Sequence, residues 1–235
     1  MTIGEARAGA DLLVSTVIPV YNGARYLAAA IDSVLAQTYR PLEIIVVDDG
    51  STDNSAEIAR SYPDVRCIYQ SNQGHGQAKN TGLATARGEF IAFLDADDLW
   101  TPDKLAVQVG YLLQHPQVDY VLAHMRVFLE PGVVWPPWLN QDHYMSDPVG
   151  FLPGTLVARR AVFARTGGFD VSYRHANDSD WFFRARDTGV PMAVLPDVLL
   201  HRRIHSANLS HETRAVTEEL LRALNSSLRR KRSLE

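Results

Sequence analysis

Three aspartates stand within four positions of the stretch "FLDADDLW", at Asp95, Asp97 and Asp98. They follow a short apolar run, residues 90–94, that is typical of a buried β-strand. Carboxylates this close repel one another, and a divalent cation relieves that repulsion. Hard oxygen ligands of this kind suit Mg²⁺, Mn²⁺ or Ca²⁺. The stretch therefore predicts a metal-supported site, with Asp98 left open between support of the metal and the turn into the next helix.

A second group of carboxylates follows the β-branched run 44–47, where Asp48 and Asp49 precede the segment "GSTD". A carboxylate at a strand tip can accept hydrogen bonds from the N–H of a base or from a ribose hydroxyl, which makes Asp48 a functional candidate. Asp49 and Asp53 are explained equally well as an Asx turn or as the cap of the following helix.

Strand-like and helix-like segments alternate from residue 14 to about residue 115. This order predicts a mostly parallel sheet with right-handed crossovers and helices on both faces. In such a sheet, ligands bind outside the carboxyl ends of the strands. Four strand exits are selected by that rule, namely "PVYNG", "VDDGSTD", "QSNQGHG" and "LDADD". Farther on, residues 212–230 predict an amphipathic helix with Val216, Leu220, Leu221, Leu224 and Leu228 on one face.

Several classes of function are disfavoured. The first exit has a single glycine, Gly23, instead of the G-x-G-x-x-G of a dinucleotide-binding turn, and the chain contains no P-loop. A formal net charge of -4 gives no case for nucleic-acid binding. The lone Cys67 excludes an intrachain disulfide and agrees with a reducing cytosol. Neither a secretory signal nor a membrane span is predicted, so we expect a cytoplasmic protein.

These segments together resemble the inverting, metal-dependent family 2 glycosyltransferases, which have the GT-A fold. The resemblance rests on "VSTVIPVYNGARYLAAAIDSVLAQTY", "EIIVVDDGSTDNS", "NQGHGQAKNTGLATARGEFIAFLDADDLW", "GGFD", "NDSDW" and "HRRIHSANLS". They extend from Val14 to about Ser210, and their order and spacing are far more specific than a D-x-D alone. The resemblance implies an α/β fold with one Rossmann-like sheet and an acceptor-side half at the C-terminus.

The resemblance also implies roles for residues of the donor site. Pro19, Tyr21 and Asp48 would line the pocket for the base and ribose, and Lys79, in an A-[RK]-N-x-G pattern, would lie near the base or the diphosphate. Asp95 would be the ribose-side carboxylate and Asp97 the metal ligand, with Ala96 between them. Asn72, Gly74 and Asn80 fit the same loop pattern, as much for its shape as for contact.

For the chemistry, the resemblance points to the C-terminal half. Gly168 of "GGFD" would lie beside the donor sugar, and Asp178 of "NDSDW" would be the catalytic base. Position 177 is Asn where the family commonly has Glu, which keeps Asp180 open as the alternative base. A base is required on chemical grounds too, because inverting transfer needs a carboxylate that takes the proton of the acceptor hydroxyl.

The segment "HRRIHSANLS" would fold over the diphosphate. Within it, His205 is a further metal or phosphate contact, and Arg202 or Arg203 could pair with phosphate oxygens. The aromatic segment Trp135-Pro136-Pro137-Trp138 is either an acceptor platform or the packing of an unsupported loop.

The predicted activity is transfer of a sugar from a nucleoside diphosphate sugar, with UDP as the expected nucleotide and Mn²⁺ or Mg²⁺ as the cofactor, to a carbohydrate, lipid-linked or protein acceptor. A sugar nucleotidyltransferase and a non-catalytic nucleotide-sugar-binding subunit are the alternatives. We expect one domain over 1–235, with a donor half at about 14–115, an acceptor and catalytic half at about 116–210, and a helix with a basic tail at 211–235. The tail, Leu228 to Ser233, leaves peripheral membrane association open, and a homodimer remains open too.

Overall fold

Parallel strands alternate with helices through the first half of the chain, as predicted. The computed structural model describes residues 12–137, 139–208 and 212–232. The elements of this half are β1 (Val14–Val20), α1 (Ala24–Leu35), β2 (Leu42–Asp48), α2 (Ser55–Arg60), β3 (Val65–Tyr69), α3 (His75–Thr85), β4 (Phe90–Phe93), β5 (Leu99–Trp100) and α4 (Lys104–Gln114). The two-residue β5 was not predicted.

Longer strands and shorter helices make up the second half. Its elements are β6 (Tyr120–Leu129), α5 (Gln141–Met145), the 3-10 turn η1 (Pro153–Thr155), β7 (Val157–Arg159), α6 (Ala161–Thr166), α7 (Asn177–Asp187), β8 (Met192–Ile204) and α8 (Thr213–Arg232). Helix α5 and the turn η1 lie between β6 and β7.

One eight-stranded sheet runs through both halves in the order β3-β2-β1-β4-β7-β6-β8-β5. The pairs among β1 to β4 are parallel, whereas β7 is antiparallel to both β4 and β6. Strand β8 pairs parallel to β6 and antiparallel to β5. Because β4 and β5 flank the aspartates of "DADD" and β5 pairs with β8, the segment around residues 200–205 is brought beside those aspartates.

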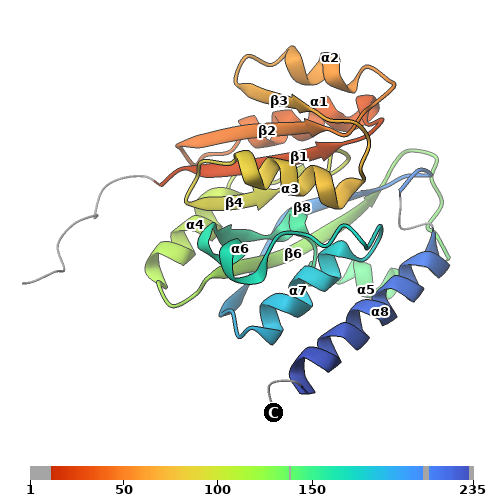
Figure 1. Cartoon of the computed structure of the whole chain (residues 1–235). Coiled ribbons are helices and arrows are strands. Elements are labelled where there is room, and N and C mark those ends of the chain that lie inside the picture. Colours follow the sequence, from red (N-terminus) through yellow and green to blue (C-terminus); the bar gives the residue numbers. More distant parts are fainter. Residues whose placement is uncertain (1–11, 138, 209–211, 233–235) are drawn as a thin grey trace, which may run out of the picture.

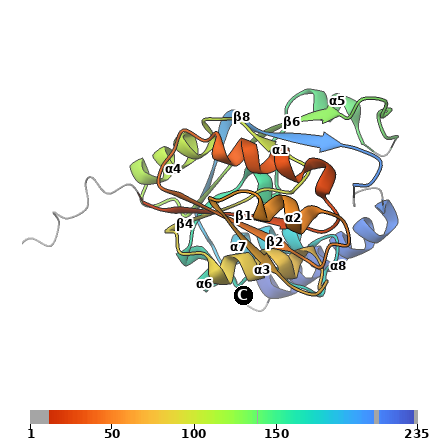
Figure 2. The ribbon, with the colours of Figure 1, turned by 90° about the horizontal axis from the view of Figure 1, so that it is seen from above.

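Each face of the sheet has its own apolar layer. Helices α1 and α4 cover one face, and α3, α6 and α7 cover the other (Figures 1 and 2). The continuous apolar runs explain this arrangement, since all seven residues of β1 are buried. Helix α1 buries Leu27, Ala30, Ile31 and Val34, the stripe that its spacing predicts. Helix α3 lies so close to β1 that a Cβ on Gly82 would come within 2.2 Å of Val17.

Helix α8 differs from its prediction. It runs along the outside of the molecule against α7 (Figure 1). The residues that it buries completely are small, Ala223 and Ser227, whereas Leu221, Leu224 and Leu228 are exposed. The five apolar residues that the sequence analysis places on one face are therefore divided, with only Val216 and Leu220 half-buried. No helix within the described ranges is both long and apolar enough to cross a membrane.

Candidate active site

Six of the predicted donor residues lie at or just after the carboxyl ends of three adjacent strands, namely Pro19, Tyr21, Asp48, Asp95, Ala96 and Asp97. Val20 at the end of β1 pairs with Asp48 at the end of β2, and β4 on the other side of β1 leads into Asp95. Beyond β1, Tyr21 is 54% exposed, whereas Pro19 within β1 is buried. The parallel register alone therefore gathers these residues at one edge of the sheet. Ala96 is half-buried against the apolar layer of α1 and α4.

Asp48 is completely buried, and its two carboxylate oxygens differ. Oδ1 accepts a hydrogen bond from the backbone N–H of Ser51 at 2.9 Å. Oδ2 is buried too, and within the described chain it has no hydrogen-bond partner. A buried acceptor of this kind is costly to leave unpaired, so Oδ2 suits a ligand N–H or O–H that enters the site.

The neighbouring acids, Asp49 and Asp53, are tied into the loops. Asp49 accepts from the backbone N–H groups of Gln73 and Gly74, at 2.9 and 2.8 Å, which joins the exits of β2 and β3. Asp53 accepts from the N–H groups of Ser55 and Ala24, both at 3.0 Å. Burial raises the pKa of Asp53, but the hydrogen bond from the Ser55 hydroxyl, together with these backbone hydrogen bonds, outweighs it and leaves the pKa lowered. Their turn and capping roles account for both acids.

Asp95 faces the beginning of α3. Its Oδ1 lies 3.1 Å from Nε2 of His75, and its side chain is 30% exposed. Burial raises the pKa of Asp95, but the charge and hydrogen bond of His75 and the charges of Lys79 and Arg202 outweigh it, so the pKa falls to about 2. Asp95 is therefore ionised at neutral pH. His75 was not predicted, although its place within the exit "QSNQGHG" could have signalled it.

Asp97 faces the segment that follows β8. Its Oδ2 lies 2.9 Å from Nε2 of His205 and accepts from Nδ2 of Asn208 at 3.0 Å. The ring of His205 packs against that of Tyr26 at a tilt of 37°, with a centroid separation of 4.6 Å. The two residues predicted as metal ligands, 108 positions apart, thus lie in direct contact.

Asp98 points into the protein instead. It is 2% exposed, and its Oδ1 accepts from the backbone N–H of Arg203 at 2.8 Å. Burial, together with the charges of Asp97 and Asp95, raises the pKa of Asp98 well above its usual range. Of the two roles left open for Asp98, this geometry favours the turn into the next helix over support of the metal.

The residues present would supply two ligands to a cation. No cluster of three or more histidine, cysteine or acidic side chains that could hold a metal occurs in the described part of the chain. Asp97 and His205 offer an oxygen and a nitrogen that already face each other, and both ligand types suit Mn²⁺. They fit an ion that brings further ligands with it, as the ion of a bound diphosphate does.

Asp178, the predicted base, lies in the first turn of α7 and contacts Lys79 of α3. The side chain of Asp178 is 23% exposed, whereas that of Lys79 is 0% exposed. The ammonium of Lys79 also donates to Oδ1 of Asn177 at 2.8 Å. These contacts of Lys79 were not anticipated, and its predicted place near the donor stays a prediction.

The other candidate base, Asp180, is buried in an ion pair. It is 2% exposed, and its Oδ2 accepts from Nε of Arg184 at 2.7 Å. Arg230 of α8 also approaches Asp180, at 3.9 Å. A carboxylate enclosed in this way cannot reach an acceptor hydroxyl, so the geometry favours Asp178 over Asp180.

The "GGFD" loop is fastened to α3 by Asn80. The side chain of Asn80 donates to the carbonyl of Phe169 and accepts from its N–H, both at 2.8 Å. A Cβ on Gly168 would come within 2.4 Å of Oδ1 of Asn80, so this close approach requires glycine. Lys79 and Asn80, neighbours on one helix, therefore hold two separate segments of the C-terminal half.

Helix α8 supplies a positioning residue that the sequence analysis missed. The carboxylate of Glu219 accepts from three successive backbone N–H groups just before α7, those of Arg174, His175 and Ala176, at 3.1, 2.7 and 2.9 Å. It thus caps the helix that carries Asp178. Nothing in the sequence signals this contact, because Glu219 resembles any polar residue of a surface helix.

In the described part of the aromatic segment, the side chain of Trp135 packs against the protein rather than projecting freely into solvent. Trp135 donates from Nε1 to the carbonyl of Leu139 at 2.6 Å and packs beside Val127 and Ile204. Trp138 lies outside the described residues.

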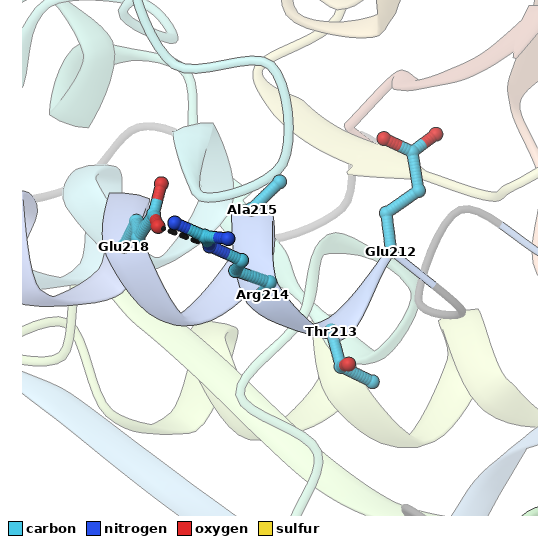
Figure 3. A pocket seen from close by; sticks show the side chains of 5 residues that line it. All are labelled: Glu212, Thr213, Arg214, Ala215 and Glu218. Carbon is cyan, nitrogen blue, oxygen red and sulfur yellow. Dashed lines mark hydrogen bonds and ion pairs between the residues drawn. The ribbon is translucent and has the colours of Figure 1, made fainter.

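A shallow hollow at the beginning of α8 takes in none of the predicted site residues. It is lined by Glu212, Thr213, Arg214, Ala215 and Glu218 (Figure 3). Arg214 and Glu218 pair at 2.8 Å but are 91% and 63% exposed. The carboxylates at the strand ends therefore remain the candidate site.

Comparisons with known proteins identify the family of this chain. Residues 15–169 match the family described as "Glycosyl transferase family 2". An uncharacterized glycosyltransferase of Rickettsia typhi is 35% identical over 220 residues, which cover 88% of this chain and 69% of the relative.

Two solved structures share the fold. TarS 1-349 of S. aureus in complex with UDP-GlcNAc has a TM-score of 0.76 at 21% identity, covering 92% of this chain and 66% of that one. The mannosyltransferase PcManGT of Pyrobaculum calidifontis, in complex with GDP-Man and Mn²⁺, has a TM-score of 0.73 at 23% identity, covering 94% and 65%. The chain thus spans just under two thirds of either structure, and it belongs to glycosyltransferase family 2, as a glycosyltransferase with the predicted GT-A fold.

Proposed function

We propose that this glycosyltransferase moves a sugar from a nucleoside diphosphate sugar to an acceptor hydroxyl with inversion, with the carboxylate of Asp178 as general base. The observation that carries the proposal is the place of Lys79 between two acidic groups. Its ammonium contacts Asp178, and its charge helps to lower the pKa of Asp95 at the strand ends. Asp95 and the proposed base are therefore both influenced by one cation.

In the proposed reaction the acceptor oxygen bonds to the anomeric carbon, the bond from that carbon to the diphosphate breaks, and Asp178 takes the hydroxyl proton. Asp48 supports the donor because its buried Oδ2 can accept from the base or the ribose. Asp97 and His205 would hold Mn²⁺ or Mg²⁺, which supplies charge compensation for the leaving diphosphate. Arg202 adds positive charge at the same edge.

Support for a nucleotide-sugar donor also comes from the two similar structures, which contain UDP-GlcNAc and GDP-Man with Mn²⁺. We propose UDP as the nucleotide here. A thermal-shift screen of UDP-, GDP- and dTDP-sugars, with and without MnCl₂, tests both proposals. We expect a metal-dependent stabilisation by UDP-sugars, and an equal or larger shift with GDP-sugars would contradict the assignment of the nucleotide.

Sugar nucleotidyl transfer is the alternative reaction. Membership of family 2 and the single glycine of the first exit both speak against it. Incubation with a sugar phosphate and UTP distinguishes the two, since only a nucleotidyltransferase releases pyrophosphate. The third alternative, a non-catalytic subunit, would bind donor without transfer across an acceptor panel.

For the acceptor we propose a hydroxyl of a carbohydrate, a lipid-linked molecule or a protein. We also propose that the chain is a single domain, because one sheet runs through both of its halves.

The last turn of α8 carries Arg229, Arg230, Lys231 and Arg232 beside the exposed Leu228. Cations beside exposed leucines suit an anionic membrane surface, and we propose peripheral association there, on the cytoplasmic side. Co-sedimentation with vesicles that contain an anionic lipid, compared with neutral vesicles, tests it. Light scattering would reveal a homodimer instead.

A further inference from the structure

Lys79 has an unusual environment for a lysine, since its side chain is 0% exposed. Its ammonium contacts Oδ1 of Asp178, lies 2.8 Å from Oδ1 of Asn177 and stands 4.2 Å from the centre of the Phe169 ring. A buried ammonium is costly unless it is paired and hydrogen-bonded. Within the described ranges, Asp178 is the only carboxylate in contact with it.

Asn177 explains the position of the Lys79 ammonium. It is 1% exposed, and while its Oδ1 accepts from Lys79, its Nδ2 donates to the carbonyls of Tyr173 and Arg174, both at 3.3 Å. A carboxylate at this position has no N–H for those two carbonyls. It would also give Lys79 a second negative partner in competition with Asp178. An amide therefore fits this position, and it leaves Asp178 as the counter-charge of Lys79.

We propose that Lys79 is a positioning residue of the transfer reaction, whose ammonium, seated by Asn177, orients the carboxylate of Asp178 toward the acceptor without touching the donor. One carboxylate oxygen is held by Lys79, so the other is directed to the partly exposed side of the residue. This inference rests on the proposed role of Asp178, and it differs from the donor contact that the family resemblance implies for Lys79.

Lys79→Met tests the proposal because it should lower turnover without weakening donor binding. We expect kcat to fall about a hundredfold, the size of loss that follows misplacement of a reacting group by about 1 Å. Affinity for UDP in the presence of MnCl₂, measured by calorimetry, is expected to stay within about twofold of the wild type. Lys79→Arg keeps a cation that can donate to both partners, and it should recover most of the lost turnover.

Two results would overturn the proposal. The first is a fall of tenfold or more in UDP affinity in Lys79→Met, which would make Lys79 a donor contact. The second is unchanged turnover in Lys79→Met when Asp178→Asn is inactive. Should Asp178→Asn retain full turnover, the proposed base itself fails, which is a separate outcome.

Asn177→Asp keeps the test decisive if Lys79→Met does not fold. This substitution preserves the size of the side chain and adds a competing carboxylate beside Lys79. Turnover is expected to fall about tenfold with UDP affinity unchanged. Wild-type turnover in a folded Asn177→Asp protein would contradict the proposal that Asn177 positions the ammonium of Lys79. Circular dichroism and thermal melting establish the folding of each variant.

Discussion

The two sides of the candidate site are built by different means. On the donor side, adjacent parallel strands end together, and backbone N–H groups hold the acids of the β2 exit, as Ser51 holds Asp48; Asp97, which His205 and Asn208 contact, is the exception. On the base side, side chains from distant segments hold the chain, as Lys79 holds residues 177–178 and Glu219 caps α7. The donor side therefore follows from the order of the strands, whereas the base side depends on individual side-chain contacts.

This difference has a consequence for mutation. A change in an exit residue of the donor side should remove one ligand contact and leave the sheet intact. On the base side, a change in a fastening residue should move a loop or helix that carries chemistry, so function and stability should fall together. The variants below separate these two behaviours, beginning with those that have the largest expected effect.

Asp178→Asn should cause the largest loss, because it removes the proposed base. General-base catalysis contributes roughly 10² to 10⁴ in rate, and we expect kcat to fall by about that factor in a transfer assay. UDP binding should be retained. Asp142→Asn, an exposed carboxylate of α5, is the control and should keep full activity. An active Asp178→Asn enzyme would exclude Asp178 as the base.

Asp97→Ala comes next and tests the donor side alone. We expect a fall in kcat/KM of about a hundredfold or more, together with loss of the Mn²⁺-dependent gain in UDP affinity. The melting temperature should change little, since the sheet is untouched. Asp64→Ala removes an exposed carboxylate before β3 as a control. A variant that still binds UDP more tightly with Mn²⁺ would show that the metal is held elsewhere.

Gly168→Ala tests the base side through the backbone. The added methyl would meet Oδ1 of Asn80 at 2.4 Å, and such overpacking typically costs about 1 to 3 kcal/mol. Denaturant unfolding measures the loss, which should be accompanied by lower turnover because the loop must move. Gly110→Ala is the matched control, since its added Cβ meets nothing within 4 Å and helix propensity predicts a gain of about 1 kcal/mol.

Glu219→Gln should have the smallest effect, and one that depends on pH. Burial raises the pKa of Glu219, but hydrogen bonds from residues 174–176 outweigh it and lower the pKa. A folded-state pKa below the unfolded value, about 4.3, stabilises the protein above that pH, and the stabilisation is lost as pH falls.

At pH 7 we therefore expect Glu219→Gln to lower the free energy of unfolding by about 1 kcal/mol, as for loss of a helix cap. The difference from the wild type should shrink toward pH 3 in denaturant titrations. The adjacent Glu218→Gln, which affects only an exposed ion pair, should change stability by less than about 0.5 kcal/mol at either pH. A pH-independent loss in Glu219→Gln would contradict the role of the charge.

The donor side could be predicted from the sequence because its signals are local. Apolar runs that end in Asp48 and Asp95 fix both the strands and the edge at which those acids meet. The contact between Asp97 and His205 was expected only through the family resemblance, since no local pattern joins residues 108 positions apart.

The rest could not be predicted, because its determinants are pairings across the chain. Nothing around Asn80 indicates that its amide holds Phe169, 89 positions away. The leucines of α8 show the opposite problem, since a regular apolar pattern predicted a buried face and the structure buries Ala223 and Ser227 instead. Close packing of α8 against α7 favours small residues, a requirement that periodicity does not express.

The 98 positions that separate Lys79 from Asn177 also bear on synthesis of the protein. A ribosome delivers the chain from its N-terminus, so β1 to β4 find their neighbours early, from contacts that are close in sequence. Lys79 meets Asn177 and Asp178 only when α7 has emerged, and the cap from Glu219 arrives later still. A nascent or truncated chain that stops before residue 177 would carry every strand-end aspartate but would lack the amide and the carboxylate that pair with the Lys79 ammonium, and so the last quarter of the chain both completes the catalyst and supplies the counter-charge for the part that was made first.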